Sequence, residues 1–147
     1  MRLQKNTSLA LYSVLEFVMD PGRHVSAAGI ADKYGVSAHH LAKVLAALAR
    51  AGIVESVRGA RGGYRFVGNA RRLTLMDIIV LFEDLGPPTG AGREPGESTS
   101  VGRALGDVLS EIDEMAKATL GSITLATMRR LIERKQAQQG ASARKRG

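Results

Sequence analysis

The sequence predicts a mainly α-helical fold with one small β-hairpin, and three observations support this. Apolar residues make up 44% of the 147 residues, whereas aromatic residues are only 4% and Trp is absent, a composition that favours an aliphatic core built from helices. Apolar side chains also recur at helical spacing in several segments. Finally, a glycine-rich tip joins two β-rich segments, 53–58 and 64–67, as is typical of a hairpin.

The first predicted helix covers residues 8–19, because its apolar residues recur every three or four positions. Val25 is then expected to pair, as a short strand, with the later hairpin. Ser26 is a good N-cap for a second helix that runs to about Tyr34. Gly35 follows where a bend between two closely crossing helices is expected.

The next predicted helix begins at an N-cap, Ser37, and ends at Gly52. Its two faces differ in character: one presents donors, among them His39 and Lys43, and the other is aliphatic. This division is expected of a helix that packs on a core with one side and reads DNA with the other. The predicted buried stripe consists of Leu41, Val44, Leu45 and Leu48.

Helix, tight turn, helix and hairpin, in this order, predict a winged helix-turn-helix, a shape that fits DNA. The hairpin tip, residues 59–63, can adopt positive φ angles and approach a sugar-phosphate backbone. Arg58, Arg61 and Arg65 flank the tip, and Arg61 is placed to enter a minor groove. The alternative is an ordinary surface hairpin with solvated charges. A nucleotide-binding phosphate loop is rejected, because the Gly-Lys-Ser/Thr ending is missing.

Two adjacent histidines, His39 and His40, raise the question of a metal site. Adjacent helical residues point about 100° apart, so both cannot easily hold one ion. The third histidine, His24, is not close in sequence, and we therefore expect no metal. Hydrogen bonding of the imidazoles to bases or phosphates is the favoured interpretation, and a merely solvated His39 is the alternative.

The charge is distributed unevenly along the chain. The formal net charge of +7 divides into +7 over residues 1–74, −6 over 75–127 and +6 over 128–147. A basic face attracts a polyanion, because each Lys or Arg near a phosphate releases condensed counterions. Charge alone would equally fit a solvated surface, but together with the helix-turn-helix pattern it favours double-stranded DNA as the partner.

The second half of the chain predicts a helix, a loop and a dimerisation helix. Thr74 and Asp77 match a variant of the capping box, so a helix should close the core before Gly86. Ser100 is expected to cap a long helix whose apolar residues alternate spacings of four and three. This seam should bury against a second copy of the chain, with burial in its own domain as the alternative. The predicted dimerisation residues are Val101, Leu105, Val108, Ile112 and Met115.

The predicted organisation has four parts. Thr124 can cap a final short helix, and the chain becomes polar from Glu133 onward. Residues 86–100 are rich in Gly, Pro, Ser and Thr and lack apolar periodicity. The expected parts are a winged helix-turn-helix domain over 1–85, a flexible loop over 86–100, dimerisation helices over 101–132 and a disordered basic tail over 133–147.

Composition also argues against several classes of protein. No apolar run is long enough to span a membrane, and the N-terminus lacks the features of a signal peptide. Without Cys there is no disulfide framework and no thiolate metal site. Three scattered histidines and no paired carboxylates offer no catalytic constellation. We expect a cytoplasmic protein that is not an enzyme, with no membrane partner and no cofactor.

Taken together, these segments resemble the Rrf2 (Rrf-two) family of bacterial transcription regulators, which has IscR- and NsrR-like members. The resemblance runs from Leu3 to about Leu131, and the hairpin sequence is its most specific part. It is carried by Ile30-Ala31, Tyr34-Gly35-Val36-Ser37, His40-Leu41-Ala42-Lys43-Val44, Leu48, Ala51-Gly52, Val57-Arg58-Gly59-Ala60-Arg61-Gly62-Gly63-Tyr64 and Thr124-Leu125-Ala126.

The resemblance implies a homodimer, with long helices crossed between subunits, that binds a dyad-symmetric operator. It implies base contacts from the start of the helix after Ser37 and minor-groove entry by Arg61, in agreement with the residue spacing. The complete set of expected DNA contacts is Ser37, Ala38, His39, His40, Lys43, Arg58, Arg61, Gly62, Gly63 and Tyr64.

The chain departs from the family in one respect. IscR- and NsrR-like members carry three cysteines in the loop before the dimer helix, where they hold an iron–sulfur cluster. Residues 86–100 contain none here, and Ser8 stands where some relatives have a ligating carboxylate. Such a cluster needs thiolates, so we predict none.

The expected function is a dimeric, sequence-specific transcription regulator, more often a repressor than an activator. It would be controlled by a small molecule, a protein effector or abundance alone. The alternative is a dimeric interaction protein that binds an enzyme or another regulator, with weak or effector-dependent DNA binding.

Overall fold

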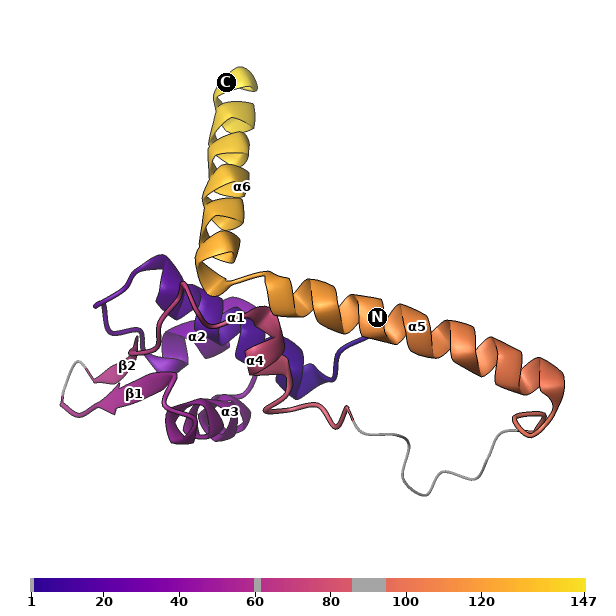
Figure 1. Ribbon diagram of the computed structural model, residues 1–147. Helices are drawn as coiled ribbons and strands as arrows, with labels where there is room; N and C mark the ends of the chain where they lie inside the picture. Colours follow the sequence, from indigo (N-terminus) through magenta and orange to yellow (C-terminus); the bar gives the residue numbers. More distant parts are fainter. Residues whose placement is uncertain (1, 60–61, 86–94) are drawn as a thin grey trace.

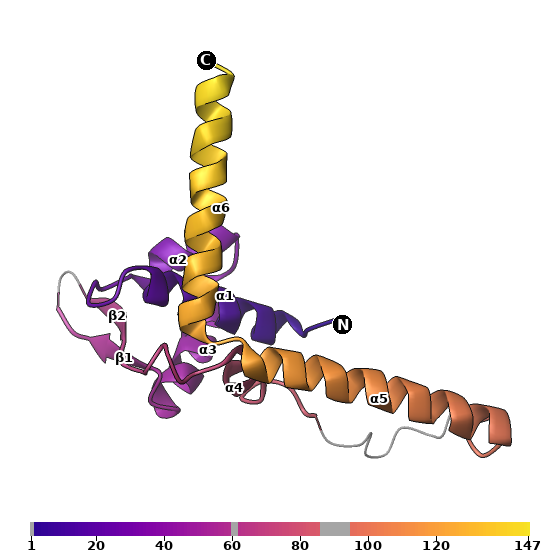
Figure 2. The same cartoon turned by 45° about the horizontal axis from the view of Figure 1, so that its top comes forward.

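The computed structural model describes residues 2–59, 62–85 and 95–147. In this part of the chain, four helices and a hairpin form one body, and two long helices leave it in different directions (Figures 1 and 2). The predicted fold class, mainly α with a small β-hairpin, is confirmed. The elements are α1 (Lys5–Met19), α2 (Ala27–Tyr34), α3 (Ala38–Arg50), β1 (Val54–Val57), β2 (Gly63–Phe66), α4 (Leu75–Ile79), α5 (Ser100–Ser122) and α6 (Leu125–Lys145).

Side-chain caps fix where the helices begin. The hydroxyl oxygen of Ser26 accepts a hydrogen bond from the backbone N–H of Gly29 at 3.0 Å, as an N-cap should. Thr74 and Asp77 form the predicted capping box at the start of α4. Thr124 caps α6 as predicted. At α5 the cap is Thr99 rather than Ser100, because the Thr99 oxygen accepts from the N–H of Gly102.

The core is aliphatic and lies between α1, α3 and the hairpin. Phe17 is the largest fully buried side chain, and its ring lies 6.4 Å from that of Tyr64. The predicted apolar stripe of α3 is buried at every position. Val25 pairs with Tyr64 in an antiparallel bridge, as predicted, through two backbone hydrogen bonds of 2.9 Å. The start of α2 is thereby fastened to the hairpin.

The start of α1 is held by a residue that follows α4. The helix begins at Lys5, earlier than predicted, and its N-cap Gln4 makes no side-chain cap. Instead, Oε1 of Glu83 accepts from the backbone N–H of Gln4 at 2.6 Å and from the hydroxyl of buried Thr7 at 2.7 Å. Free N–H groups at the start of a helix need hydrogen-bond acceptors. Glu83 provides one for α1, although it lies more than seventy residues after the start of that helix.

A carboxylate also links α1 to α2. Glu16 accepts hydrogen bonds from the Lys33 ammonium and the Tyr34 hydroxyl. Burial alone would raise the pKa of Glu16, but these hydrogen bonds and the positive charge of Lys33 outweigh it, so the pKa lies below its usual value. Burial and the neighbouring Glu16 carboxylate raise the pKa of Tyr34. The Tyr34 ring in turn stacks on Tyr12 at 5.0 Å.

This network predicts pH-dependent stability. A carboxyl group with a lowered pKa stabilises the fold above its ordinary pKa, and that contribution is lost as pH falls through the folded-state value. Glu16→Gln should therefore lower the urea midpoint at neutral pH but lose this effect as the pH falls below the ordinary Glu pKa of about 4.3 and through the lower folded-state value. The exposed Glu55, which pairs with Arg65, provides a control: Glu55→Gln should matter less at neutral pH. An equal effect of Glu16→Gln at both pH values would contradict this interpretation.

The junction between α5 and α6 is tied to the helical body, and we call this junction the elbow (residues 69–75 with 123–126). Thr74 and Thr124 form an antiparallel bridge. The N–H of Leu75 donates to Ile123 at 3.0 Å, that of Leu125 to Leu73 at 2.8 Å, and that of Ala126 to Ala70 at 2.8 Å. These backbone hydrogen bonds hold both long helices against the body at one point. Buried Leu125 completes the attachment.

Two further predicted boundaries are wrong. The helix expected to run toward Gly86 ends at Ile79, because the N–H groups of Leu81 and Phe82 bond three residues back and tighten the chain into a turn. The tail predicted to be disordered over 133–147 continues α6 as far as Lys145. Its side chains are all exposed, so packing does not explain this helix. Its Glu, Arg, Lys, Gln and Ala residues are instead good helix formers, which the low hydrophobicity concealed.

The predicted flexible loop can be followed only in part. Residues 86–94 lie outside the described residues, and the segment from Pro95 forms turns that lead into α5. None of the helices in the described part of the chain combines the length and the apolar character needed to cross a lipid bilayer.

Candidate nucleic-acid interface

Helix α3 is anchored on its inner side and open on its outer side. Leu41, Leu45 and Leu48 are fully buried, so the rotation of the helix about its axis is fixed by packing. Ser37 caps the helix by accepting from the N–H of His40 at 3.1 Å. Gly35 adopts a left-handed conformation, with φ of 64°, at the bend between α2 and α3. The sequence thus orients one defined face of α3 outward.

The outward face of α3 carries most of the predicted contacts. Ser37, Ala38, His39 and Lys43 are exposed. His40 is only half-buried, yet its Nε2 atom is buried and finds no hydrogen-bond partner among the described residues. A buried polar atom without a partner is unfavourable. His39 is therefore better placed than His40 to meet a base edge in this conformation.

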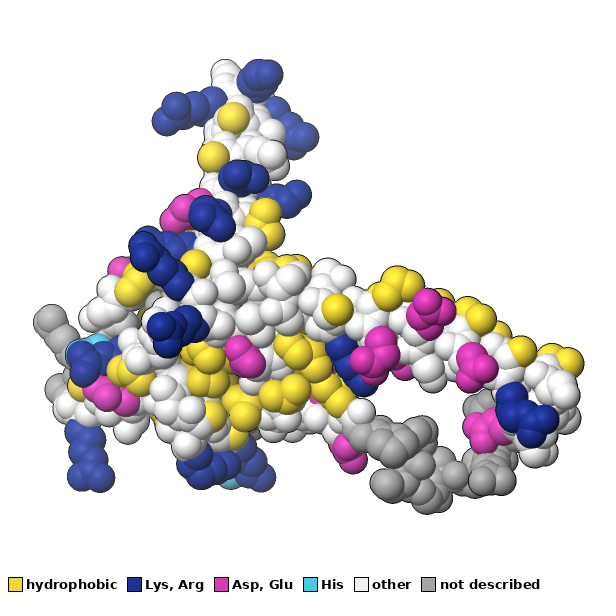
Figure 3. Space-filling view, viewed as in Figure 1, with side chains coloured by type: hydrophobic (Ala, Val, Ile, Leu, Met, Phe, Trp, Pro, Cys, Tyr) yellow, Lys and Arg dark blue, Asp and Glu magenta, His cyan; other side chains and the backbone are white. Residues whose placement is uncertain are grey.

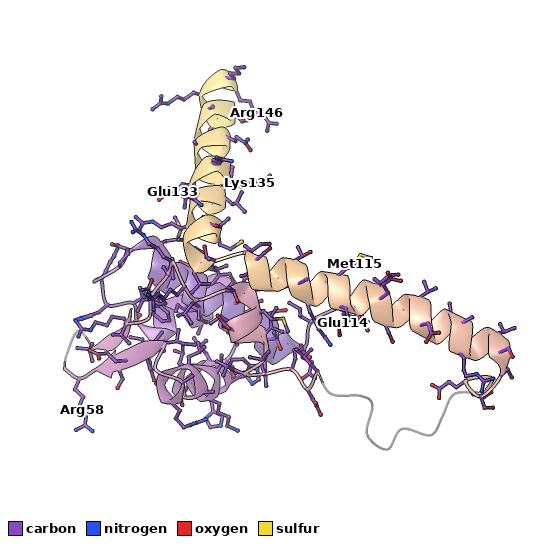
Figure 4. The ribbon with its side chains drawn as sticks, in the orientation of Figure 1. Arg58, Glu114, Met115, Glu133, Lys135 and Arg146 are labelled. Atoms are coloured by element: carbon purple, nitrogen blue, oxygen red, sulfur yellow. The ribbon has the colours of Figure 1, made fainter. Side chains whose placement is uncertain are left out.

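The hairpin presents arginine beside α3. Val54 pairs with Phe66 and Val57 with Gly63 in an antiparallel register. Arg58 is exposed and points away from the hairpin (Figure 4). Gly59 has a φ of 131°, the positive angle predicted at the tip. Arg61, the residue predicted to enter a minor groove, lies outside the described residues.

The other predicted hairpin contacts have structural partners. Gly62 donates to the carbonyl of Gly59 at 2.9 Å, and Tyr64 pairs with Val25. Gly63 lies so close to Val25 that an added Cβ would be 2.6 Å from the Val25 carbonyl oxygen. Gly63 and Tyr64, both half-buried, hold the hairpin on the body, whereas the Gly62 bond lies within the hairpin. Arg65 is also engaged, since its Nε donates to Glu55 at 2.7 Å.

The exposed side chains of α3 and the hairpin lie on one side of the molecule. Lys and Arg side chains project below α3 and below the hairpin in the space-filling view (Figure 3). Arg58 projects from this side, whereas Lys135 lies on α6 and Arg146 lies just after its last residue, and α6 rises from the opposite side (Figure 4). In the described residues, no group of three or more His, Asp or Glu could hold a metal ion. The face offers donors to an anion.

Helix α5 has an apolar face without a partner in the isolated chain. It contributes no buried residue, and hydrophobic side chains follow its length (Figure 3). All five predicted dimerisation residues are more than half exposed, from Ile112 at 53% to Val101 at 79%. The seam is therefore not buried in its own domain. Such a contiguous apolar face is typical of an interaction surface.

The chain thus combines a helix-turn-helix, an arginine-bearing hairpin and a long helix, α5. This combination is also found in known proteins. A family model described as Rrf2, an iron-dependent transcriptional regulator, matches residues 3–130. This chain belongs to the Rrf2 family. The resemblance predicted from Leu3 to about Leu131 is thus confirmed over nearly the same range.

Individual relatives agree with this assignment. BadM of Rhodopseudomonas palustris, named as an HTH-type transcriptional regulator, is 51% identical over 149 residues, covering 98% of this chain and 94% of the relative. The structure of T. potens IscR covers 94% of this chain and 91% of that one, with 27% identity and a TM-score of 0.70. CymR, the global cysteine regulator of B. subtilis, gives 25% identity and a TM-score of 0.63, with 89% and 98% covered. Rrf2 proteins are transcription regulators, not enzymes, as predicted.

The family description names iron, so the fit of this chain to an iron–sulfur cluster can be tested. Cys is absent from all 147 residues. The described residues that lead into α5 offer one carboxylate, Glu97, and no thiolate. Cluster ligation requires thiolates, with only occasional replacement. The donor set of this Rrf2 protein does not fit a cluster.

Sequence reasoning missed the residues whose partners lie far along the chain. Glu83 and Glu16 each accept two hydrogen bonds from distant groups. Neither belongs to a local motif, and no pattern in the sequence connects them with their partners. Periodicity and capping describe contacts within a few residues, so a long-range hydrogen bond leaves no such signal.

Proposed function

We propose that this Rrf2 protein is a dimeric, sequence-specific DNA-binding repressor that acts in the cytoplasm without an iron–sulfur cluster. Membership of a family of transcription regulators implies DNA binding. The observation that carries the proposal is the division of α3, whose aliphatic side is buried while His39 and Lys43 remain exposed beside Arg58. The predicted contacts Ser37, Ala38 and His40, and Arg61, Gly62, Gly63 and Tyr64 of the hairpin, belong to the same proposal.

The proposed dimer forms through α5, and its operator has dyad symmetry. The exposed apolar seam supports this arrangement. A two-fold dimer would place two copies of α3 in successive major grooves, about 34 Å apart. Phosphate contacts would set the register, and His39 and Lys43 would read base edges. Control would come from a small molecule, a protein effector or abundance.

The acidic surface of α5 favours a second candidate function, the binding of another protein. Asp107, Glu111, Asp113 and Glu114 are all exposed there. A basic partner protein could use this surface, and DNA binding would then be weak or effector-dependent. The two functions differ in their response to salt, because specific recognition adds affinity beyond the phosphate contribution.

The deciding experiment is selection of genomic fragments by the purified dimer at two salt concentrations. Enrichment of a palindrome that persists at the higher salt would support the regulator. Placing that palindrome over a promoter in a reconstituted transcription reaction would then test repression. Featureless enrichment that collapses with salt would reject sequence-specific binding and favour the interaction protein.

Lys43→Ala should weaken operator binding without unfolding the protein. A bidentate base contact contributes about 1–3 kcal/mol of discrimination, so an affinity loss of about 5- to 150-fold is expected. The loss should be smaller on random DNA. Fluorescence anisotropy on both duplexes would measure it, with circular dichroism to confirm folding.

Lys135→Ala is the matched control, because Lys135 is an exposed lysine on α6, away from α3 and the hairpin (Figure 4). It removes the same charge and should change operator affinity less than twofold. Equal losses in the two variants would mean that net charge, rather than the α3 face, sets the affinity.

A further inference from the structure

A groove lies where α6 leaves the helical body, and its lining includes neither the seam residues of α5 nor the predicted DNA contacts. Its walls come from the end of α1, the end of β2, the turn over residues 68–71 and the first turns of α6. Its volume is about 730 Å³. Sites for small organic ligands are concave and occupy about 300–1,000 Å³. The groove is therefore large enough for one such ligand.

The floor of the groove is apolar. It includes Val18, which is only 1% exposed, and the half-buried residues Phe66, Ala70 and Ala126. Apolar atoms at the floor favour a ligand with a hydrophobic body, because contact removes apolar surface from water. A bare phosphate or sulfate would leave this surface unused.

The rim of the groove carries three arginines and one carboxylate. Arg129 donates through Nε to Glu133 at 3.1 Å, so these two charges offset each other. Among the residues that the structure describes, Arg130 has only a neutral partner, the hydroxyl of Thr127, at 3.3 Å. Across the described residues no carboxylate pairs with Arg71 or Arg130. Two guanidinium groups therefore remain for a ligand.

The groove is not on the DNA-binding face. Lys and Arg side chains gather around the base of α6 on the upper part of the molecule, whereas Arg58 and α3 lie on the lower part (Figures 3 and 4). Guanidinium groups bind carboxylates and sulfonates through paired hydrogen bonds. We propose that this groove is a binding site for a small organic anion with an apolar body, anchored by Arg71 and Arg130.

A ligand in this groove would contact both sides of the elbow. Ala70 and Ala126 line the groove, and they are joined by the 2.8 Å hydrogen bond between the N–H of Ala126 and the Ala70 carbonyl. The ligand would thus touch the body that carries α3 and the helix that follows α5. The site is defined by ligand binding alone and can be tested without DNA.

The test uses the full-length protein and anilinonaphthalene sulfonate, a fluorescent organic anion. We expect saturable binding with one site per protomer. Arg71→Gln combined with Arg130→Gln should raise the dissociation constant by about tenfold or more, because charge-assisted hydrogen bonds are lost. Arg72→Gln combined with Arg134→Gln is the matched control. It removes the same charge from neighbouring arginines outside the groove, and should change binding less than about twofold.

Competition distinguishes the possible sources of binding. Naphthoate should displace the probe at least about ten times more effectively than neutral naphthamide, which has nearly the same shape. The proposal is overturned if binding is not saturable, if the two double variants lose affinity equally, or if naphthamide competes as well as naphthoate. Displacement by inorganic phosphate as effective as that by naphthoate would also overturn it, because the apolar floor would then play no part.

Discussion

Ile112→Asp should convert the protein into a monomer that no longer binds its operator tightly. Ile112 belongs to the seam, lies near the middle of α5 and is 53% exposed in the isolated chain. In the proposed dimer the seam is buried, and each subunit would place one carboxylate in an apolar interface. Burying an unpaired carboxylate costs several kcal/mol, which exceeds what a coiled-coil seam of this length can offset.

The loss of dimerisation would also be felt at the operator. Two linked recognition helices bind more tightly than one by about 100- to 10,000-fold, because the second binding event is intramolecular. Analytical ultracentrifugation would measure the subunit mass, and anisotropy on the intact palindrome would measure affinity. Affinity for an isolated half-site should change little.

Ser110→Asp provides the comparison for this variant. Ser110 is exposed on α5 and is not part of the seam, so the same new carboxylate would face solvent in the dimer. This variant should remain dimeric and bind normally. A dimeric Ile112→Asp protein with unchanged affinity would refute the assignment of the seam.

Gly63→Ala should destabilise the protein and loosen the hairpin. An added Cβ would lie 2.6 Å from the carbonyl oxygen of Val25 and 3.1 Å from the N–H nitrogen of Ser26, both of which are backbone atoms. The chain must move apart, which strains or breaks the two hydrogen bonds between Val25 and Tyr64. Overpacking and the lost hydrogen bonds together should lower the free energy of unfolding by about 2–3 kcal/mol.

Gly140→Ala is the matched substitution with the opposite expected sign. Gly140 lies within α6, and an added Cβ there would meet no atom within 4 Å. Ala is favoured over Gly inside a helix, so stability should stay constant or rise by up to about 1 kcal/mol. Urea unfolding of both variants would measure the changes. If Gly63→Ala were as stable as the parent protein, the contact with Val25 would not hold the hairpin.

Sequence reasoning succeeded where structure is decided locally. The buried stripe of α3, its cap Ser37 and the Thr74–Asp77 capping box were all predictable, because each depends on residues within one or two helical turns. Val25 was also expected to pair with the hairpin, and it forms an antiparallel bridge with Tyr64.

Other features depended on contacts that the sequence does not display. Nothing near Glu83 in the chain indicates that its carboxylate holds Gln4 and Thr7. The sequence suggests that Gly63 is a flexible residue of the hairpin tip. In the structure, however, Gly63 has no room for a side chain because the backbone of Val25, distant in sequence, lies against it. In the last fifteen residues the local signal was present but was misread. Their polarity suggested disorder, whereas their helix propensity extends α6 to Lys145.

The elbow bears on the distance between the half-sites of an operator as well as on the bases that are recognised. Its backbone hydrogen bonds join α5 and α6 to the body at one point, so the orientation of α5 relative to α3 does not depend on the side chains proposed to contact DNA. In the proposed dimer, the two copies of α3 would then be held at one fixed separation. Substitutions in α3 could change which bases are recognised, and substitutions at residues 69–75 or 123–126 could change the distance between half-sites. The two properties could therefore evolve separately.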